Sequence, residues 1–170
     1  SNAAFTVKTI EMGTNGLVLG SDSTDLTIAD NLTVIGGTDS GDADLTLNGP
    51  AEVQGSGIGS NGGTVTFGAG AGGTSFAEGT GMRMDNTTLE LKTSLNVRWL
   101  DLQGVSSSLK TNGNILNING GIEIGGGSEL DFTNVTTDNE SELSLVGDAS
   151  ITKTGDIVLS HINTKGYTLT

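Results

Sequence analysis

Apolar residues along the chain recur in short alternating pairs, and three residues separate one pair from the next. The segment TDLTIADNLTVIGG (24–37) carries two such pairs, Leu26 with Ile28 and Leu32 with Val34, and two glycines close it. Nineteen positions later the segment ADLTLNGPAEVQGS repeats the arrangement. Side chains of a strand alternate between its two faces, so each pair predicts a short strand with its apolar side chains on one face.

The template L-x-[L/I]-x-x-x-[L/A/I]-x-[V/I] fits five places, and looser pairs begin at residues 5, 65 and 167. The first positions are then 5, 26, 45, 65, 89, 116, 143 and 167, with steps of 19 to 27 residues. Two further pairs, at 130 and 157, lie at the same offset from the copies at 116 and 143, and Val135 and Ile162 follow them at matching places. They predict a third strand in these turns. The predicted inward ladder is Leu26, Ile28, Leu32, Val34, Leu45, Leu47, Val53, Val65, Phe67, Leu89, Leu91, Leu95, Val97, Leu116, Ile118, Ile122, Ile124, Leu130, Phe132, Leu143, Leu145, Ile151, Ile157 and Leu159.

A period of about 20 residues is the signature of a stacked repeat architecture. One coil cannot bury its apolar edge alone, whereas parallel stacking joins the inward side chains into a continuous core. The sequence therefore predicts an all-β, single-chain parallel β-solenoid, a right-handed β-helix of about seven coils of 19–27 residues. We expect one domain over 4–170, after a tag remnant at 1–3, and the glycine-rich segments 55–63 and 68–75 as loops leaving the shaft. Because neither end carries a capping helix, we expect a fragment of a longer protein or end-to-end self-association.

Two other architectures remain open at this point. An antiparallel β-sandwich also consists of short alternating strands, and five Asn-Gly dipeptides suit its tight hairpins. A trimeric intertwined fibre is the other alternative. A sandwich does not require the same nine-residue pattern at a recurring period, so the repeat favours the solenoid.

The amino-acid sequences of the repeats resemble those of a known class of protein. Units such as NLTVIGG, ADLTLNG and GNILNINGGIEIGGGSELDF resemble the repeats of bacterial surface adhesins, namely autotransporter passenger domains and filamentous-haemagglutinin-like proteins. Phage tail fibres contain similar sequence patterns. The resemblance covers most of the chain from about residue 5 and implies export, an extracellular or cell-surface location, and contact with a host, matrix or neighbouring cell.

Composition and charge narrow the function classes. The net charge is −13, and nine carboxylates but no Lys or Arg lie between Lys8 and Arg83. Nucleic acids and anionic lipids bind through clustered positive charge, so we expect no nucleic-acid partner. The chain has no Cys, which excludes thiolate chemistry. No apolar run approaches the length of a membrane span, so membrane insertion is not expected, and no motif implies a cofactor.

The strongest candidate for ligand contact is the segment NVRWLDLQG (96–104). Trp99 is the only Trp, and Arg98 and Asp101 flank it. Sugars stack on aromatic rings and hydrogen-bond to arginines and carboxylates, so these three residues are candidate carbohydrate contacts. The simpler interpretation places Trp99 in the core, because it follows inward Val97 by two positions.

Other candidates are weaker. His161 is the only histidine, and nothing in the sequence supplies a catalytic or metal-binding partner for it. Asp39, Asp42 and Asp44 lie close together and offer oxygen ligands for calcium, but the calcium-binding nonapeptide is not met. An outward row of Thr27, Thr46 and Thr66 suits an ice-binding face, yet Glu90 follows it in the next copy.

The sequence thus predicts a non-catalytic structural or adhesive module whose partner is a host or matrix protein or a glycan. A polysaccharide-degrading or carbohydrate-binding β-helix and a phage tail-fibre segment are the alternatives. A groove lined by convergent charged residues would favour the enzyme, and a smooth shaft would favour the adhesin.

Overall fold

The computed structural model describes residues 5–11, 17–18, 26–34, 38–39, 44–53, 57–138, 141–153 and 157–170, with side chains from residue 44 onward. Short strands make up most of it. They are β1 (Phe5–Glu11), β2 (Leu17–Val18), β3 (Leu26–Val34), β4 (Thr38–Asp39), β5 (Leu45–Leu47), β6 (Ala51–Val53), β7 (Ile58–Asn61), β8 (Thr64–Phe67), β9 (Ser75–Phe76), β10 (Met82–Asp85), β11 (Thr88–Leu91), β12 (Leu95–Val97), β13 (Leu100–Gln103), β14 (Ser108–Lys110), β15 (Leu116–Ile118), β16 (Gly121–Gly125), β17 (Ser128–Asp131), β18 (Val135–Thr137), β19 (Glu142–Leu145), β20 (Ala149–Thr152) and β21 (His161–Asn163).

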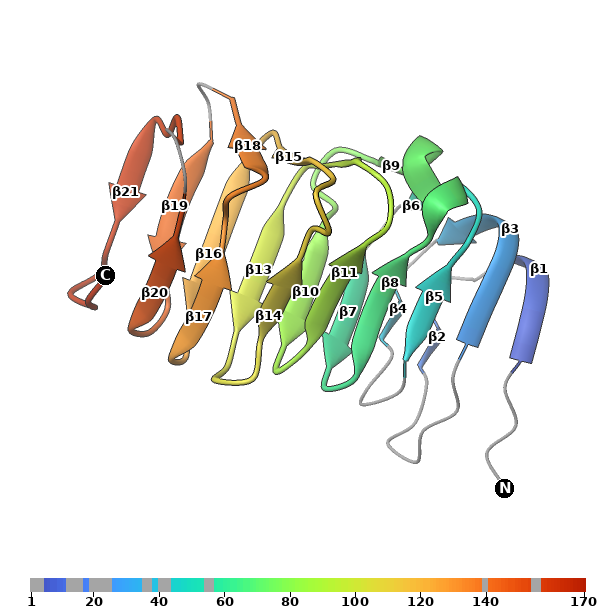
Figure 1. Cartoon of the computed structure of the whole chain (residues 1–170), viewed down its shortest axis with the longest axis horizontal. Coiled ribbons are helices and arrows are strands. Elements are labelled where there is room, and N and C mark those ends of the chain that lie inside the picture. Colours follow the sequence, from blue (N-terminus) through green and yellow to red (C-terminus); the bar gives the residue numbers. More distant parts are fainter. Residues whose placement is uncertain are drawn as a thin grey trace.

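All strand pairs among these residues are parallel, and they form a three-sided shaft (Figure 1). Face A contains β1, the start of β3, β5, β8, β11 and β14, with β17 and β20 stacked beyond them. Face C contains the end of β3, β6 and β9, followed by β12, β15 and β18. Face B is an eight-stranded sheet in the order β2, β4, β7, β10, β13, β16, β19, β21.

The chain visits the faces in the order A, C, B. Five complete three-stranded turns are described, from β5–β6–β7 to β17–β18–β19, and the sheets continue beyond them at both ends of the shaft. This arrangement confirms the parallel β-solenoid and excludes the antiparallel sandwich for the described strands. The right-handed winding stays a prediction.

The core is the ladder that the alternation predicts. Leu45, Val65 and Leu89 pair in register along face A, and all three side chains are fully buried. The predicted ladder from Leu45 to Leu145 is buried throughout, while Ile151, Ile157 and Leu159 are partly buried against its end. Leu26, Ile28, Leu32 and Val34 lie in β3, but their side chains are outside the described residues.

The predicted alignment of the turns is wrong in the second half of the chain. Leu116 pairs with Leu95 and Val135, and not with Leu89 and Leu143. Leu130 likewise pairs with Ile151 and not with the Ile157 pair. The described turns are therefore shorter than the longest predicted coils, as the register of Met82 with Leu100 shows. Those long coils arose because the template fits any two successive strands of a three-sided turn.

The described parts of the glycine-rich segments, residues 57–63 and 68–75, pack on the shaft, contrary to expectation. Residues 58–61 form β7, and Ile58 is buried in the core. Residues 69–73 form a 3-10 helix, η1 (Ala69–Gly73), whose Ala71 is buried. Glycine is needed here for close packing: a Cβ on Gly70 would lie 2.2 Å from the Asn48 carbonyl oxygen.

The Asn-Gly dipeptides that the structure describes mark corners of the turn and not hairpins. Asn112 and Gly113 have φ values of 52° and 82°, the left-handed conformation that these two residue types tolerate best. The Asn112 side-chain amide donates to the Leu91 carbonyl of the preceding turn at 3.0 Å. The corner therefore holds successive turns together while the strands on either side of it remain parallel to their neighbours.

Candidate functional site

The outward side of face B carries a varied set of polar side chains. Alternation turns Met82, Met84, Leu100 and Leu102 into the core, so the residues between them face outward. The parallel register then aligns the outward residues in rows across neighbouring strands. One row is Gly59, Arg83, Asp101 and Glu123, and the next is Asn61, Asp85, Gln103 and Gly125.

Asp101 lies at the centre of this surface and is almost fully covered, although its position faces outward. Only 3% of its side chain is exposed. The Gln103 side-chain amide donates to both carboxylate oxygens, at 2.7 and 2.8 Å. Arg83 Nε lies 3.4 Å from Asp101 Oδ2, and the Arg83 side chain is 63% exposed. A buried carboxylate thus anchors an arginine whose guanidinium remains open to solvent.

Burial raises the pKa of Asp101 above its ordinary value, because the charged form loses hydration. The hydrogen bond from Gln103 and the charge of Arg83 act against this rise, while the nearby carboxylates Glu123 and Asp85 add to it. Glu123 has its own partner, Lys165, whose Nζ lies 3.9 Å from Glu123 Oε1. The carboxylates of Glu123 and Asp85 therefore influence Asp101, and Arg83 is the cation paired with it.

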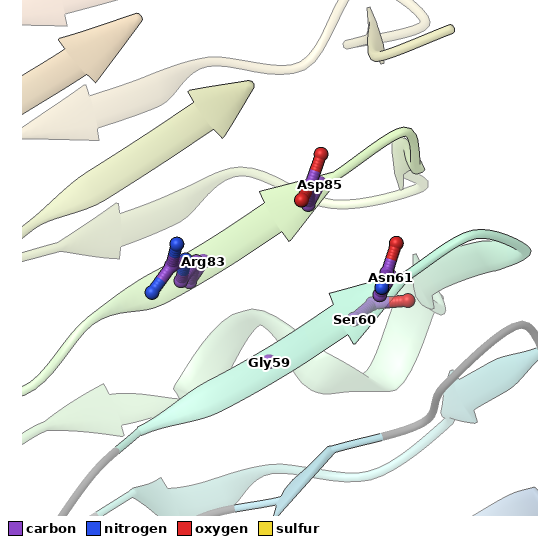
Figure 2. A pocket seen from close by; sticks show the side chains of 5 residues that line it. All are labelled: Gly59, Ser60, Asn61, Arg83 and Asp85. Atoms are coloured by element: carbon purple, nitrogen blue, oxygen red, sulfur yellow. The ribbon is translucent and has the colours of Figure 1, made fainter. Parts of the chain in front are cut away.

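A hollow of about 240 Å³ lies beside Arg83 on this face. Gly59, Ser60 and Asn61 of β7 and Arg83 and Asp85 of β10 line it. Figure 2 shows Arg83 and Asp85 on one strand, and Gly59, Ser60 and Asn61 on the neighbouring strand. Gly59 is the register partner of Arg83, so the missing side chain leaves space beside the guanidinium. The hollow offers a cation, a carboxylate and an amide to a polar ligand.

Trp99 occupies an outward position two residues before Asp101. The simpler interpretation expected it in the core, but it lies outside the core. Its side chain is half-buried at the corner between β12 and β13. Glycines lie in the adjacent turns: a Cβ on Gly121 would lie 2.9 Å from Trp99 Cδ1, and one on Gly81 would lie 2.7 Å from Trp99 Cβ. The indole fills the room that these glycines leave.

A second hollow, of about 420 Å³, opens at Trp99. Its lining includes Trp99, Arg98, Glu78 and the two neighbouring glycines, Gly81 and Gly121. The three predicted contact residues are therefore placed as follows. Trp99 and Asp101 lie on one face, and Arg98 lines the Trp99 hollow without contributing an ion pair to Asp101 among the described interactions.

Sequence reasoning missed the other members of this surface: Arg83, Asp85, Gln103 and Glu123. The signal was present, since each occupies an outward position of a strand whose alternate residues are apolar. Met82 and Met84 do not fit the Leu/Ile template, and so β10 was overlooked. The register that brings Arg83 beside Asp101 depends on the short turn from β10 to β13, which the template did not give.

The other candidate residues lie elsewhere. His161 is exposed on β21, next to Glu142 in register. Asp44 Oδ1 accepts a hydrogen bond from the Thr64 N–H at 2.7 Å, while Asp42 and the Asp39 side chain lie outside the described residues. Thr27, Thr46 and Thr66 pair in one row, and Glu90 and Lys110 continue it, so charged side chains interrupt the threonine face as expected.

Among the described residues, no three His, Asp or Glu side chains come close enough together to hold a metal ion. That part of the chain also has no helix with the length and hydropathy of a membrane span. Comparisons with protein-family models, curated proteins and solved structures gave no match. The resemblance to surface adhesins is therefore supported at the level of the β-solenoid fold.

Proposed function

We propose that the chain is a non-catalytic adhesive module of a bacterial cell-surface or secreted protein. It is a β-solenoid shaft that contacts a host, matrix or neighbouring-cell component through the outward side of face B. The observation that carries this proposal is the surface around Asp101. There the stacked register places the exposed side chains of Arg83 and Asn61 beside one hollow, and Trp99 lines a second.

Charged side chains do line the two hollows, which taken alone would favour an enzyme, but the state of Asp101 supports binding over catalysis. A general acid or nucleophile needs an open path to its substrate, whereas Asp101 is 3% exposed and both its oxygens accept from Gln103. Its role on this surface is to orient Arg83 and Gln103. The apolar residues serve the shaft, so recognition is left to outward polar side chains and Trp99. The surface or secreted location is part of the proposal and rests on the resemblance of the repeats.

A binding screen against immobilised matrix proteins, glycans and intact cells tests the proposal. The double variant Arg83→Glu with Trp99→Ala should lose binding to the target that the native chain binds. The matched control is Lys110→Glu with Tyr167→Ala, which makes the same two kinds of change away from this surface. Binding that both double variants retain would contradict a role for face B. An empty screen together with a turnover activity would overturn the adhesive function.

A polysaccharide-degrading enzyme is the second candidate, and one observation favours it. Asp85, Asp101 and Glu123 lie on three adjacent strands, and the charges of Asp85 and Glu123 both raise the pKa of Asp101. Paired carboxylates are the usual machinery of glycoside hydrolysis. This candidate predicts that a neutral or acidic polysaccharide shortens on incubation, and that Asp101→Asn and Glu123→Gln each abolish the shortening. Unchanged chain length across a broad panel would exclude it.

A further inference from the structure

We infer that the outward side of face B around Trp99, Arg83 and Asn61 binds an uncharged oligosaccharide built of hexose units. This inference rests on the proposed adhesive function and names the class of ligand for the same surface. Its basis is the combination of an aromatic ring, a set of hydrogen-bonding groups and a local balance of charge.

The aromatic ring is Trp99. The faces of pyranose rings carry C–H groups that pack on indole, and tryptophan offers the largest surface for such stacking. The glycine at position 121 leaves room for the indole over the adjacent turn, and the remaining surface of the ring lines the hollow of about 420 Å³. Packing against the neighbouring turn restricts the ring before any ligand arrives, which lowers the entropic cost of binding.

The hydrogen-bonding groups lie two to four positions from the Trp99 row, about 7 to 13 Å along the strand direction, and one or two strands to the side of β13. Asn61, Arg83 and Asp85 line the hollow of about 240 Å³ and present donors and acceptors together. Sugar hydroxyls act as both donor and acceptor, so a mixed set of this kind suits them. Arg83 is held by its contact with Asp101, and Asp101 is held by Gln103. The guanidinium of Arg83 is therefore oriented before a ligand binds.

Charge selects an uncharged ligand. Arg83 and Arg98 are the cations lining the two hollows, and Glu78, Asp85 and the adjacent Asp101 oppose them. The whole chain carries −13. An anionic polysaccharide would meet an unfavourable field at long range and would compete with Asp101 for Arg83 at short range. A neutral sugar avoids both costs, because its hydroxyls bond to carboxylates and guanidinium groups alike.

Trp99 is the only tryptophan of the chain, so its fluorescence reports on the site directly. The 170-residue chain is titrated with short oligomers of glucose, of mannose and of galactose, and with oligogalacturonate as the anionic counterpart. We expect a saturable change in emission with at least one neutral oligomer and none with oligogalacturonate. Emission that stays constant with every neutral oligomer, or that responds to oligogalacturonate alone, overturns the inference.

Variants locate the binding by calorimetry with the neutral oligomer that responds. Trp99→Ala and Arg83→Gln should each weaken it at least about tenfold, which corresponds to about 1.4 kcal/mol. Tyr167→Ala and Lys110→Gln are the matched controls and should leave it unchanged. Arg83 is exposed, so its variant remains informative if Trp99→Ala impairs folding. Full affinity in the Arg83 variant contradicts the inference.

The oligomer titration and the binding screen of the proposed function together separate this inference from that function. If the chain binds a matrix protein or cells through face B but no neutral oligomer, the ligand class is wrong and the adhesive function stands. If the chain binds no target in either experiment, both fail.

Discussion

At the scale of single residues, Asp101 shows how the stack changes the chemistry of a side chain. Its position faces outward, yet neighbours from its own strand and from the adjacent turn cover it. A carboxylate on an isolated strand would be hydrated. Here the parallel stack places Arg83 beside it, and the strand itself places Gln103 two residues away. Burial and pairing therefore arise together.

The raised pKa of Asp101 predicts a pH dependence of stability. Between the ordinary pKa of Asp and the raised value, the folded chain binds more protons than the unfolded chain. The free energy of unfolding contributed by this group therefore falls as pH rises through that window. Asp101→Asn should remove this fall, so the variant should gain stability relative to the native chain as pH rises from about 4. Urea unfolding at a series of pH values measures the difference.

Asp131 is the matched control because its pKa shifts in the opposite direction. Hydrogen bonds from the Thr133 side chain and backbone lower the pKa of Asp131, with a contribution from Lys153. The native chain should therefore lose stability relative to Asp131→Asn as pH falls below the ordinary pKa of Asp. If both variants showed the same sign of change with pH, burial would not be the dominant cause at Asp101.

At the scale of strands and corners, Lys153 links two successive turns of the shaft. Its backbone follows β20, and its Nζ donates to the carbonyls of Phe132 and Val135 in the preceding turn, at 3.0 and 2.7 Å. These carbonyls lie at the corner between β17 and β18. The ammonium group thus ties the corner of one turn to the next turn along the shaft.

Lys153→Met should lower the free energy of unfolding by about 1.5 to 3 kcal/mol, the usual range for hydrogen bonds to a charged group. Methionine retains much of the apolar stem, so the loss reports on the ammonium group. Lys165→Met is the control: Lys165 is more exposed, and its one described ion pair is long. Denaturant midpoints of the two variants compare them. An equal loss in both would mean that the corner contacts of Lys153 add nothing.

The same scale shows what could be predicted from the sequence. Alternation of apolar residues identifies many of the strands, since Leu45 with Leu47 and Leu89 with Leu91 leave little ambiguity. The faces themselves are not identified, because a leucine pair on face A is indistinguishable from one on face B. The copy at Leu116 occupies faces C and B, whereas the copy at Leu89 occupies faces A and C.

The candidate site follows the same rule. Trp99, Arg98 and Asp101 were predicted because they are close together in the sequence, in the segment NVRWLDLQG. Arg83 was missed because it belongs to the adjacent turn, and only the register between turns brings it to Asp101. That register depends on the length of each corner, which a local pattern does not encode. Sequence reasoning therefore found candidates that are neighbours in the sequence, but it missed both contacts of Asp101, the one with Gln103 on its own strand and the one with Arg83 across the stack.

At the scale of the whole molecule, the shaft is a one-dimensional array in which each turn packs only on its neighbours. The last strand of face B, β21, has a partner on one side, β19. Its Ile162 is 48% exposed and the nearby Tyr167 is 45% exposed, whereas Leu100 and Leu102 of β13 are fully buried. Stability should therefore decrease from the middle of the described shaft toward β21.

Hydrogen exchange measures this gradient directly, because an amide exchanges when its part of the structure opens. In the 170-residue chain, amides of β21 should exchange much faster than those of β13. Leu102→Ala should lower the global stability by about 2 to 5 kcal/mol, since it leaves a cavity inside the stack. Leu159→Ala, at a partly buried position near β21, should increase exchange in the last turn only. Equal protection of β21 and β13, or a global loss from Leu159→Ala, would show that the shaft opens as one unit and would contradict the array.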